Sequence, residues 1–271
     1  MNKFIKAFIA CVISIGYVIL YQLIGKFIGL FISFLFNIGF ITEPDLDIFI
    51  SSNINAIQFF KVFLFILVIY SISFLKKKSL LEKIDIKKIN IKDIFVAFHI
   101  FLALNFIMNV FLSLNIFSNL REAHESTVVV NSLLNGESFW LILLSVGILG
   151  PIAEEILFRG LILNKLLTSM NIKKAILIQA ILFGIAHEDS FQMIYAFIFA
   201  LFYGIVSYSF KSIVPAIIMH MYSNSITIIN LFVNNPKFNL FVFFIYIIAI
   251  ALTIDYIIDV IRKKKIFIFN L

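Results

Sequence analysis

Long apolar runs follow one another along almost the whole chain, and they constrain its fold more than any other feature. A helix needs about 20 predominantly apolar residues to cross the hydrocarbon core of a bilayer. Backbone polar groups cannot stay unpaired in lipid, so runs of this kind span a membrane as helices. They predict an all-α, polytopic membrane protein of about eight transmembrane helices. The predicted extents are 7–36, 56–75, 94–116, 139–164, 173–187, 191–210, 213–233 and 238–261.

The composition excludes a soluble globular domain. Apolar residues make up 62% of the 271 positions and charged residues only 14%, which is more apolar surface than a soluble domain of this length can bury. A single cysteine, Cys11, rules out an intrachain disulfide. The net charge of +7 does not indicate nucleic-acid binding, because the lysines cluster at the ends of apolar runs. We expect membrane lipids around the protein and no nucleic-acid partner.

Basic residues concentrate on alternate loops, and positive residues mark the cytoplasmic ends of spans. With eight spans, one side of the membrane receives most of the Lys and Arg residues and the other side receives the acidic loops. We therefore expect a multi-pass protein of the cell membrane with both termini cytoplasmic. The predicted cytoplasmic residues are Lys3, Lys6, Lys76, Lys77, Lys78, Lys83, Lys87, Lys88, Lys92, Lys165, Lys173, Lys174, Lys211 and Arg262 to Lys265. The opposite side has Glu43, Asp45, Asp47, Glu122, Glu125, Glu137, Glu188 and Asp189.

The first apolar run is longer than one span requires and carries Lys26 near its middle. We expect it to tilt, to kink near Gly25 or to run along the surface before it crosses. Splitting it into two spans would invert every later loop and place the basic loops on the wrong side.

Two carboxylates and a guanidinium lie inside one of the most hydrophobic runs, at Glu154, Glu155 and Arg159. An acid at bilayer depth costs roughly 2.5–3.5 kcal/mol on insertion scales, so such a cluster predicts a functional site. Glu155 and Arg159 are four residues apart on a helix and can pair, while Glu154 points about 100 degrees away. A buried ion pair that only joins two helices would leave the second carboxylate unexplained. Gly150 and Pro151 should bend this helix or free backbone groups.

Two further polar motifs lie on later helices. Phe183-x-x-x-His187 ends at the last turn of its helix, where a lone His is more often a structural hydrogen-bond partner. His220 and Asn224 share one helix face, which interhelical hydrogen bonds alone would explain. Together, however, a carboxylate, two His and an Asn are the parts of a water-activating site, with a general base and an oxyanion-stabilising pair. The implied reaction is hydrolysis of an acyl bond.

The same motifs, in this order on successive helices, resemble those of the CAAX protease and bacteriocin-processing (CPBP, or Abi) family of intramembrane proteases. The resemblance covers about residues 145–230 and includes the phrase Glu-Glu-Ile-Leu-Phe-Arg-Gly at 154–160. It implies an all-helical membrane fold with a polar intramembrane cavity. By motif position, it also implies that Glu154 and His187 activate water, that Glu155 and Arg159 support them, and that His220 with Asn224 stabilises the oxyanion; Phe183 is a further supporting residue.

The resemblance implies an endopeptidase that hydrolyses a peptide bond of a membrane-associated or lipidated peptide or protein. In the eukaryotic branch the substrate is a prenylated protein that loses its last three residues, whereas bacterial members resemble peptide-processing or bacteriocin-immunity proteins. Two alternatives stay open, a non-catalytic member acting in self-immunity or scaffolding and a proton-coupled transporter. We expect three regions: N-terminal transmembrane helices without a motif at 1–138, family-like catalytic helices at 139–233, and a last transmembrane helix with a basic tail at 238–271.

A metal cofactor is left open. Glu154, His187 and His220 would make a plausible Zn²⁺ set, and family members have been called metalloproteases. A mechanism that uses Glu and His alone needs no ion, and the residues after His187 lack the second His of a zincin helix.

Overall fold

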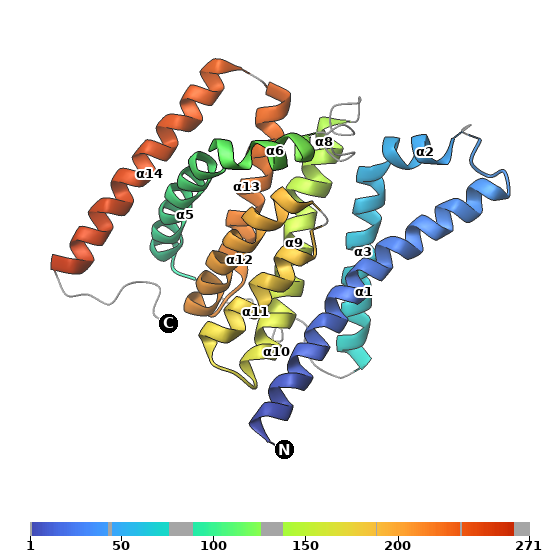
Figure 1. Cartoon of the computed structure of the whole chain (residues 1–271), viewed down its shortest axis with the longest axis horizontal. Helices are drawn as coiled ribbons and strands as arrows, with labels where there is room; N and C mark the ends of the chain where they lie inside the picture. Colours follow the sequence, from blue (N-terminus) through green and yellow to red (C-terminus); the bar gives the residue numbers. More distant parts are fainter. Residues whose placement is uncertain are drawn as a thin grey trace.

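The computed structural model of the chain describes residues 2–42, 45–75, 89–125, 138–187, 189–233 and 235–262. All regular structure in these ranges is helical, without a strand, which confirms the predicted all-α fold. The long helices form a bundle with their axes running between the same two ends, while the short helices α2 (Leu46–Ser52) and α6 (Ser118–Glu125) lie across one end (Figure 1). Some residues of the predicted charge pattern lie outside the described residues, namely Glu43, the lysines of 76–88, Glu137, Glu188 and the lysines of 263–265.

The N-terminal half contributes three long helices and several short elements. Asn2 and Asn90 cap the first and third of the long helices, because their side chains accept hydrogen bonds from backbone N–H groups of the first turn. The elements are α1 (Lys3–Asn37), α2 (Leu46–Ser52), α3 (Ile54–Leu75), α5 (Ile91–Leu112), the 3₁₀ turn η1 (Asn115–Phe117) and α6 (Ser118–Glu125).

The C-terminal half begins with a span whose backbone alternates between α-helical and π-helical hydrogen bonding. This span consists of α8 (Phe139–Ile142), η2 (Leu143–Leu149), α9 (Gly150–Glu155), η3 (Ile156–Leu163) and α10 (Asn164–Leu167). Four helices follow: α11 (Ile172–Ile185), α12 (Ser190–Phe210), α13 (Val214–Val233) and α14 (Pro236–Arg262).

The number of membrane-spanning helices differs from the prediction. Seven of the described helices are long and apolar enough to cross a membrane, where eight were predicted. The exception is α11, which has 14 residues and is about 21 Å long at 1.5 Å per residue. The hydrocarbon core is about 30 Å thick, so α11 cannot cross it alone. Because α11 stops short, His187, two residues beyond its end, is expected to lie within the depth of the membrane.

The first apolar run forms one continuous helix, α1, of 35 residues. At 1.5 Å per residue it is about 52 Å long, more than a bilayer core requires, so it must tilt or extend beyond the core. Figure 1 shows α1 crossing the edge of the bundle obliquely. The run is therefore one helix. This agrees with the charge pattern, which argued against dividing the run into two spans.

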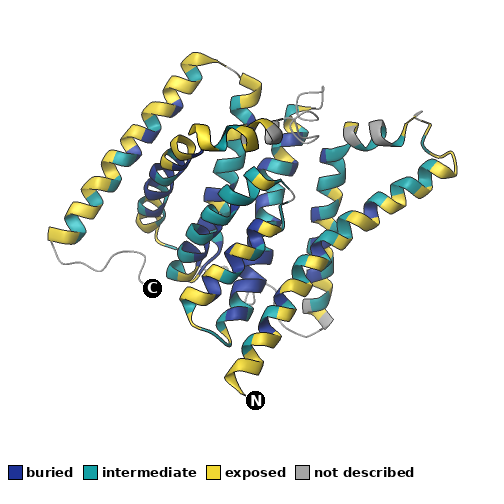
Figure 2. Cartoon of the chain, viewed as in Figure 1, coloured by how far each residue is buried: buried dark blue, intermediate teal, exposed yellow. Residues whose placement is uncertain are grey.

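Buried side chains gather on η3, α5, α11 and α12, whereas α14 is mostly exposed and α1 mixes exposed with half-buried residues (Figure 2). The exposed residues of these two helices include many large apolar side chains, which suits contact with lipid. One apolar core joins α1 and α3 to α9, η3 and α11, and a second joins α5, α12, α13 and α14. The polar motifs lie where these two cores meet.

Candidate active site

Pro151 shapes the backbone of the helix that carries the two glutamates. Proline has no N–H, so a carbonyl one turn earlier loses its usual partner. That preceding turn, η2, is π-helical, a geometry that is frequent at functional sites. Two of its carbonyls accept hydrogen bonds from α13: Asn224 Nδ2 donates to Val146 O at 3.1 Å, and Ser225 Oγ donates to Gly147 O at 3.3 Å. These bonds agree with the prediction that Gly150-Pro151 frees backbone groups, and they join α13 to this helix.

Gly147 allows α13 to approach so closely. A Cβ at this position would lie 2.9 Å from Ser225 Oγ and 3.1 Å from Leu143 Cδ1. We expect Gly147→Ala to lower the free energy of unfolding by about 1–3 kcal/mol through overpacking, measured by thermal unfolding in detergent. Gly29→Ala is the matched control, because a Cβ there has no neighbour within 4 Å among the described residues. Equal stability of the two variants would contradict the close approach.

Glu155 joins the first motif to the third. Its side chain is fully buried, and its Oε1 accepts hydrogen bonds from Arg159 Nη1 and from His220 Nδ1, each at 2.9 Å. The predicted pair of Glu155 and Arg159 is therefore confirmed. A carboxylate only accepts, so Nδ1 of His220 carries the proton of this bond, and Nε2 of the same ring is turned away from Glu155.

Arg159 is 1% exposed, and its charge is compensated on several sides. Nη2 donates to the carbonyl of Ala200 at 3.2 Å, an oxygen that also accepts from Gln179 Nε2 at 2.8 Å. The guanidinium carbon lies 4.7 Å from the ring centre of Phe183 and 5.3 Å from that of Tyr203. Aromatic faces attract cations, more strongly where water is excluded. Sequence reasoning missed Gln179 and Tyr203; a polar Gln inside an apolar helix was the one available signal.

Phe183 connects the second motif to the other two. Its ring centre lies 4.9 Å from that of His187 and 5.9 Å from that of His220. Its carbonyl accepts a hydrogen bond from His187 Nδ1 at 2.8 Å, which the spacing of four residues within the motif allows. In a neutral imidazole this leaves Nε2 of His187 as an acceptor, able to bind or deprotonate water.

Glu154 differs from Glu155 in exposure and in partners. Its side chain is 21% exposed, against 0% for Glu155. Oε2 of Glu154 lies 3.7 Å from Nε2 of His220, longer than a hydrogen bond but near enough for both groups to contact one water or substrate atom. Asn224, one turn after His220, has one amide N–H engaged by Val146 and one left. The polar groups thus gather inside the bundle as predicted, while a cavity around them stays a prediction.

The N-terminal half, which carries no motif, also borders the site. Gln22 Nε2 of α1 donates to the carbonyl of Ala186, the residue before His187, at 3.0 Å. Its neighbour Tyr21 is 5% exposed and packs against Phe65 of α3. Sequence reasoning missed both residues, since a Tyr and a Gln within a long apolar run belong to no recognisable pattern.

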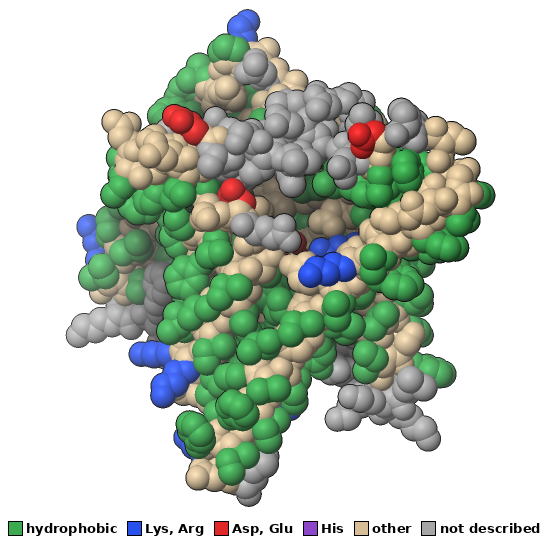
Figure 3. Space-filling view, turned by 45° about the vertical axis from the view of Figure 1, so that its right-hand side comes forward, with side chains coloured by type: hydrophobic (Ala, Val, Ile, Leu, Met, Phe, Trp, Pro, Cys, Tyr) green, Lys and Arg blue, Asp and Glu red, His purple; other side chains and the backbone are tan. Residues whose placement is uncertain are grey.

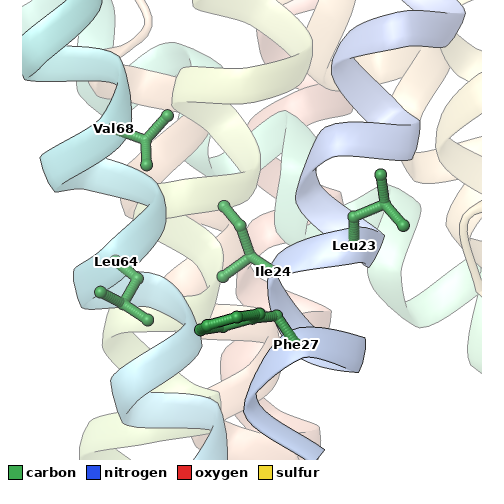
Figure 4. Close-up of a pocket in the computed structure, with 5 residues that line it drawn as sticks. All are labelled: Leu23, Ile24, Phe27, Leu64 and Val68. Carbon is green, nitrogen blue, oxygen red and sulfur yellow. The ribbon is translucent and has the colours of Figure 1, made fainter. Parts of the chain in front are cut away.

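The surface over α1 has two concave features. Figure 3 shows a hollow with basic and acidic side chains at its rim. A shallow groove of about 290 Å³ separates α1 from α3, and its lining is wholly apolar (Figure 4). The groove is lined by Leu23, Ile24, Phe27, Leu64 and Val68. Because Leu23 and Phe27 are more than half exposed, we expect the groove to contact lipid tails.

The three residues of the predicted Zn²⁺ set do not assemble into a metal site. In the part of the chain that the structure describes, no three His, Cys, Asp or Glu side chains are placed to hold a metal ion. Oε2 of Glu154 and Nε2 of His220 lie 3.7 Å apart, but His187 does not join them in a set placed to hold an ion within the described residues. These residues as placed do not fit the ion.

A family model described as Type II CAAX prenyl endopeptidase Rce1-like matches residues 136–226. This segment is Rce1-like. It contains all three motifs and agrees with the resemblance to the CPBP family. The match supports a CAAX-type intramembrane endopeptidase at the level of the family, and with seven long apolar helices it indicates a multi-pass membrane protein. Helices α1 to α6 and α14 lie outside the Rce1-like segment. Comparisons with curated proteins and with solved structures gave no match.

Proposed function

We propose that this protein is an intramembrane endopeptidase in which Glu154 and His187 activate water to hydrolyse a peptide bond of a membrane-associated or lipidated substrate. The main support is the contrast between two adjacent carboxylates. Glu155 is buried and holds Arg159 and His220, whereas Glu154 beside it is partly exposed. One carboxylate organises the site and the other remains available for chemistry.

Water activation uses the first two motifs. Glu154 takes a proton from a bound water as general base, and the water oxygen attacks the carbonyl carbon of the scissile bond. Nε2 of His187 accepts the hydrogen bond from the second water proton, because its Nδ1 proton is held by the Phe183 carbonyl. The π electrons of the carbonyl move to its oxygen and give a tetrahedral intermediate with an oxyanion.

The oxyanion is stabilised by the third motif, through Nε2–H of His220 and the remaining amide N–H of Asn224. Glu154, Glu155 and Arg159 together carry one net negative charge, so a second proton on His220 makes the cluster neutral. Collapse of the intermediate breaks the C–N bond, and Glu154 returns its proton to the leaving amine. The products are a new carboxyl group and a new amine.

Both termini are proposed to be cytoplasmic. The beginning of α1 and the end of α14 lie at the same end of the bundle in Figure 1. The beginning of α11, which carries Lys173, and the connection that contains Lys211 lie at that end too, which fits the preference of positive residues for the cytoplasm. Reporter fusions to each terminus test the orientation.

The proposed role of His187 predicts a large loss of activity on its substitution. We expect His187→Gln to lower the rate of cleavage of membrane peptides by about 10²–10⁴-fold, the usual contribution of an acid–base residue. His99→Gln is the matched control, since His99 is bonded to Thr253 at 3.0 Å on α14 and belongs to no motif. Equal rates for the two variants would remove His187 from the mechanism.

Treatment of the wild type with a chelator tests the need for a metal. If the chelator abolished cleavage and added Zn²⁺ restored it, hydrolysis by Glu and His alone would be contradicted.

A further inference from the structure

We propose that Gln22 of α1 is a positioning residue for His187: its side-chain amide holds the peptide group that joins Ala186 to His187, and so fixes where the imidazole meets the attacking water. The inference rests on the proposed function, in which His187 binds that water. It adds a residue from outside the Rce1-like segment of 136–226. Helix α1 is then a working part of the active site.

A hydrogen bond between helices that are far apart in the sequence carries this inference. Nε2 of Gln22 donates to the carbonyl oxygen of Ala186 at 3.0 Å, across a separation of 164 positions. Gln22 is half-buried and lies within the long apolar helix α1. An amide at membrane depth needs a hydrogen-bond partner from the protein, because lipid tails offer none. The partner of Gln22 is the backbone of the residue that precedes His187.

The oxygen that Gln22 binds belongs to the same peptide group as the N–H of His187. A peptide group is planar and rigid, so fixing its oxygen also fixes its nitrogen and the direction of the chain that follows. The N–H of His187 donates to the carbonyl of Gly184 at 3.0 Å. Both polar atoms of this peptide group are therefore bonded, one within the end of α11 and the other from α1.

The end of α11 provides partners for its earlier carbonyls by itself. The Leu182 carbonyl accepts from the backbone N–H of Ala186 at 3.1 Å, and the Phe183 carbonyl accepts from Nδ1 of His187 at 2.8 Å. The last carbonyls of a helix have no partner in a following turn and must find one elsewhere. For the Ala186 carbonyl, Gln22 supplies the donor that another turn of α11 would have supplied.

Packing holds the same segment against two neighbouring helices. A Cβ on Gly184 would lie 3.1 Å from the carbonyl oxygen of Met193 and 3.2 Å from Cβ of Phe197, so α11 approaches α12 closely here. On α1, Tyr21 packs edge-on against Phe65 of α3, with ring centres 5.0 Å apart, and so restrains the helix beside Gln22. The position of the end of α11 therefore depends on α12 and on α1.

The location of the reacting nitrogen of His187 follows from two contacts. Nδ1 of the ring is held by the carbonyl of Phe183, and the backbone of the residue is held through the peptide group that Gln22 binds. Without Gln22, the backbone at the end of the helix can turn and carry the ring with it. A misplacement of about 1 Å can cost about 10²-fold in rate, even when the substitution lies away from the chemistry.

Gln22→Met keeps the length of the side chain and removes the amide donor. We expect kcat for peptide cleavage to fall by about 10–10²-fold with KM changed less than about twofold, because a positioning residue acts on the chemical step. The melting temperature in detergent should change little, since one interhelical hydrogen bond contributes little in a membrane protein. Thr253→Val is the matched control, because it removes another interhelical bond, at 3.0 Å to His99, and should keep wild-type kcat.

A double variant separates positioning from a merely structural role. If Gln22 acts through His187, Gln22→Met should slow the His187→Gln variant by less than about twofold, because the group that it positions is already absent. If Gln22 only joins α1 to the bundle, its loss should slow wild type and His187→Gln by the same factor. That equal loss would overturn the positioning role.

Nitrogen-15 NMR of protein with labelled histidines tests the same contact without a substrate, which separates this inference from the proposed function. The chain has four His residues, and His187→Gln identifies the signals of His187. Gln22→Met should shift or broaden these signals and leave those of His99 unchanged, whereas Thr253→Val should do the reverse. Unchanged His187 signals in Gln22→Met would overturn the inference, even if kcat falls. Failure of the wild type to cleave any peptide would instead overturn the proposed function and leave the NMR comparison to decide on Gln22.

Discussion

Glu154→Gln is expected to lower the rate of peptide hydrolysis by about 10²–10⁴-fold while the protein keeps its fold. The amide has the size of the carboxyl group but cannot take a proton from water. Little stability should be lost, because Glu154 is partly exposed and its 3.7 Å approach to His220 is longer than a hydrogen bond. Initial cleavage rates and the melting temperature are measured in the same detergent.

The matched control is Glu122→Gln, the same exchange at an exposed position of α6 outside the bundle core. It should retain wild-type activity and stability. A Glu154→Gln variant that cleaves as fast as Glu122→Gln would contradict the role of Glu154 as general base.

Arg159→Met is expected to be among the most destabilising substitutions in the chain. Arg159 is 1% exposed and Glu155 0%, so loss of the guanidinium leaves a buried carboxylate without its main counter-charge. Breaking a buried ion pair on one side costs about 3–5 kcal/mol. The measurement is the free energy of unfolding by denaturant titration in detergent.

The double variant Glu155→Gln/Arg159→Met supplies the control for this prediction. Removing both charges avoids the unpaired carboxylate, so the double variant should be more stable than Arg159→Met alone. Because His220 also binds Glu155, we expect partial recovery of stability and no recovery of activity. The two side chains would not be coupled if the double variant lost as much free energy of unfolding as Glu155→Gln and Arg159→Met lose together.

Helical spacing made part of the site predictable. Four-residue steps bring together Glu155 and Arg159, and the same step lets His187 reach the carbonyl of Phe183. Residues four apart on a helix lie on the same face, so these contacts follow from the sequence spacing alone. The long apolar runs likewise specified an all-helical membrane protein, since lipid allows few other structures.

Contacts between distant helices were not predictable in the same way. The bond from His220 to Glu155 and the bond from Gln22 to Ala186 depend on how helices pack, and no spacing encodes that. Helix length was a second source of error: the apolar run at 173–187 has 15 residues and α11 has 14, both fewer than the about 20 that a span requires. It was therefore wrong to count this run as an eighth span.

Glu154 is proposed to activate water for attack on a peptide bond. The most direct test of this role is cleavage of a membrane peptide in oxygen-18 water, followed by mass spectrometry of the products. We expect wild type to place one oxygen-18 atom in the new carboxyl group and Glu154→Gln to form this product at least about 10²-fold more slowly. Absence of labelled product from wild type, or its formation at the wild-type rate by Glu154→Gln, would show that Glu154 does not activate water.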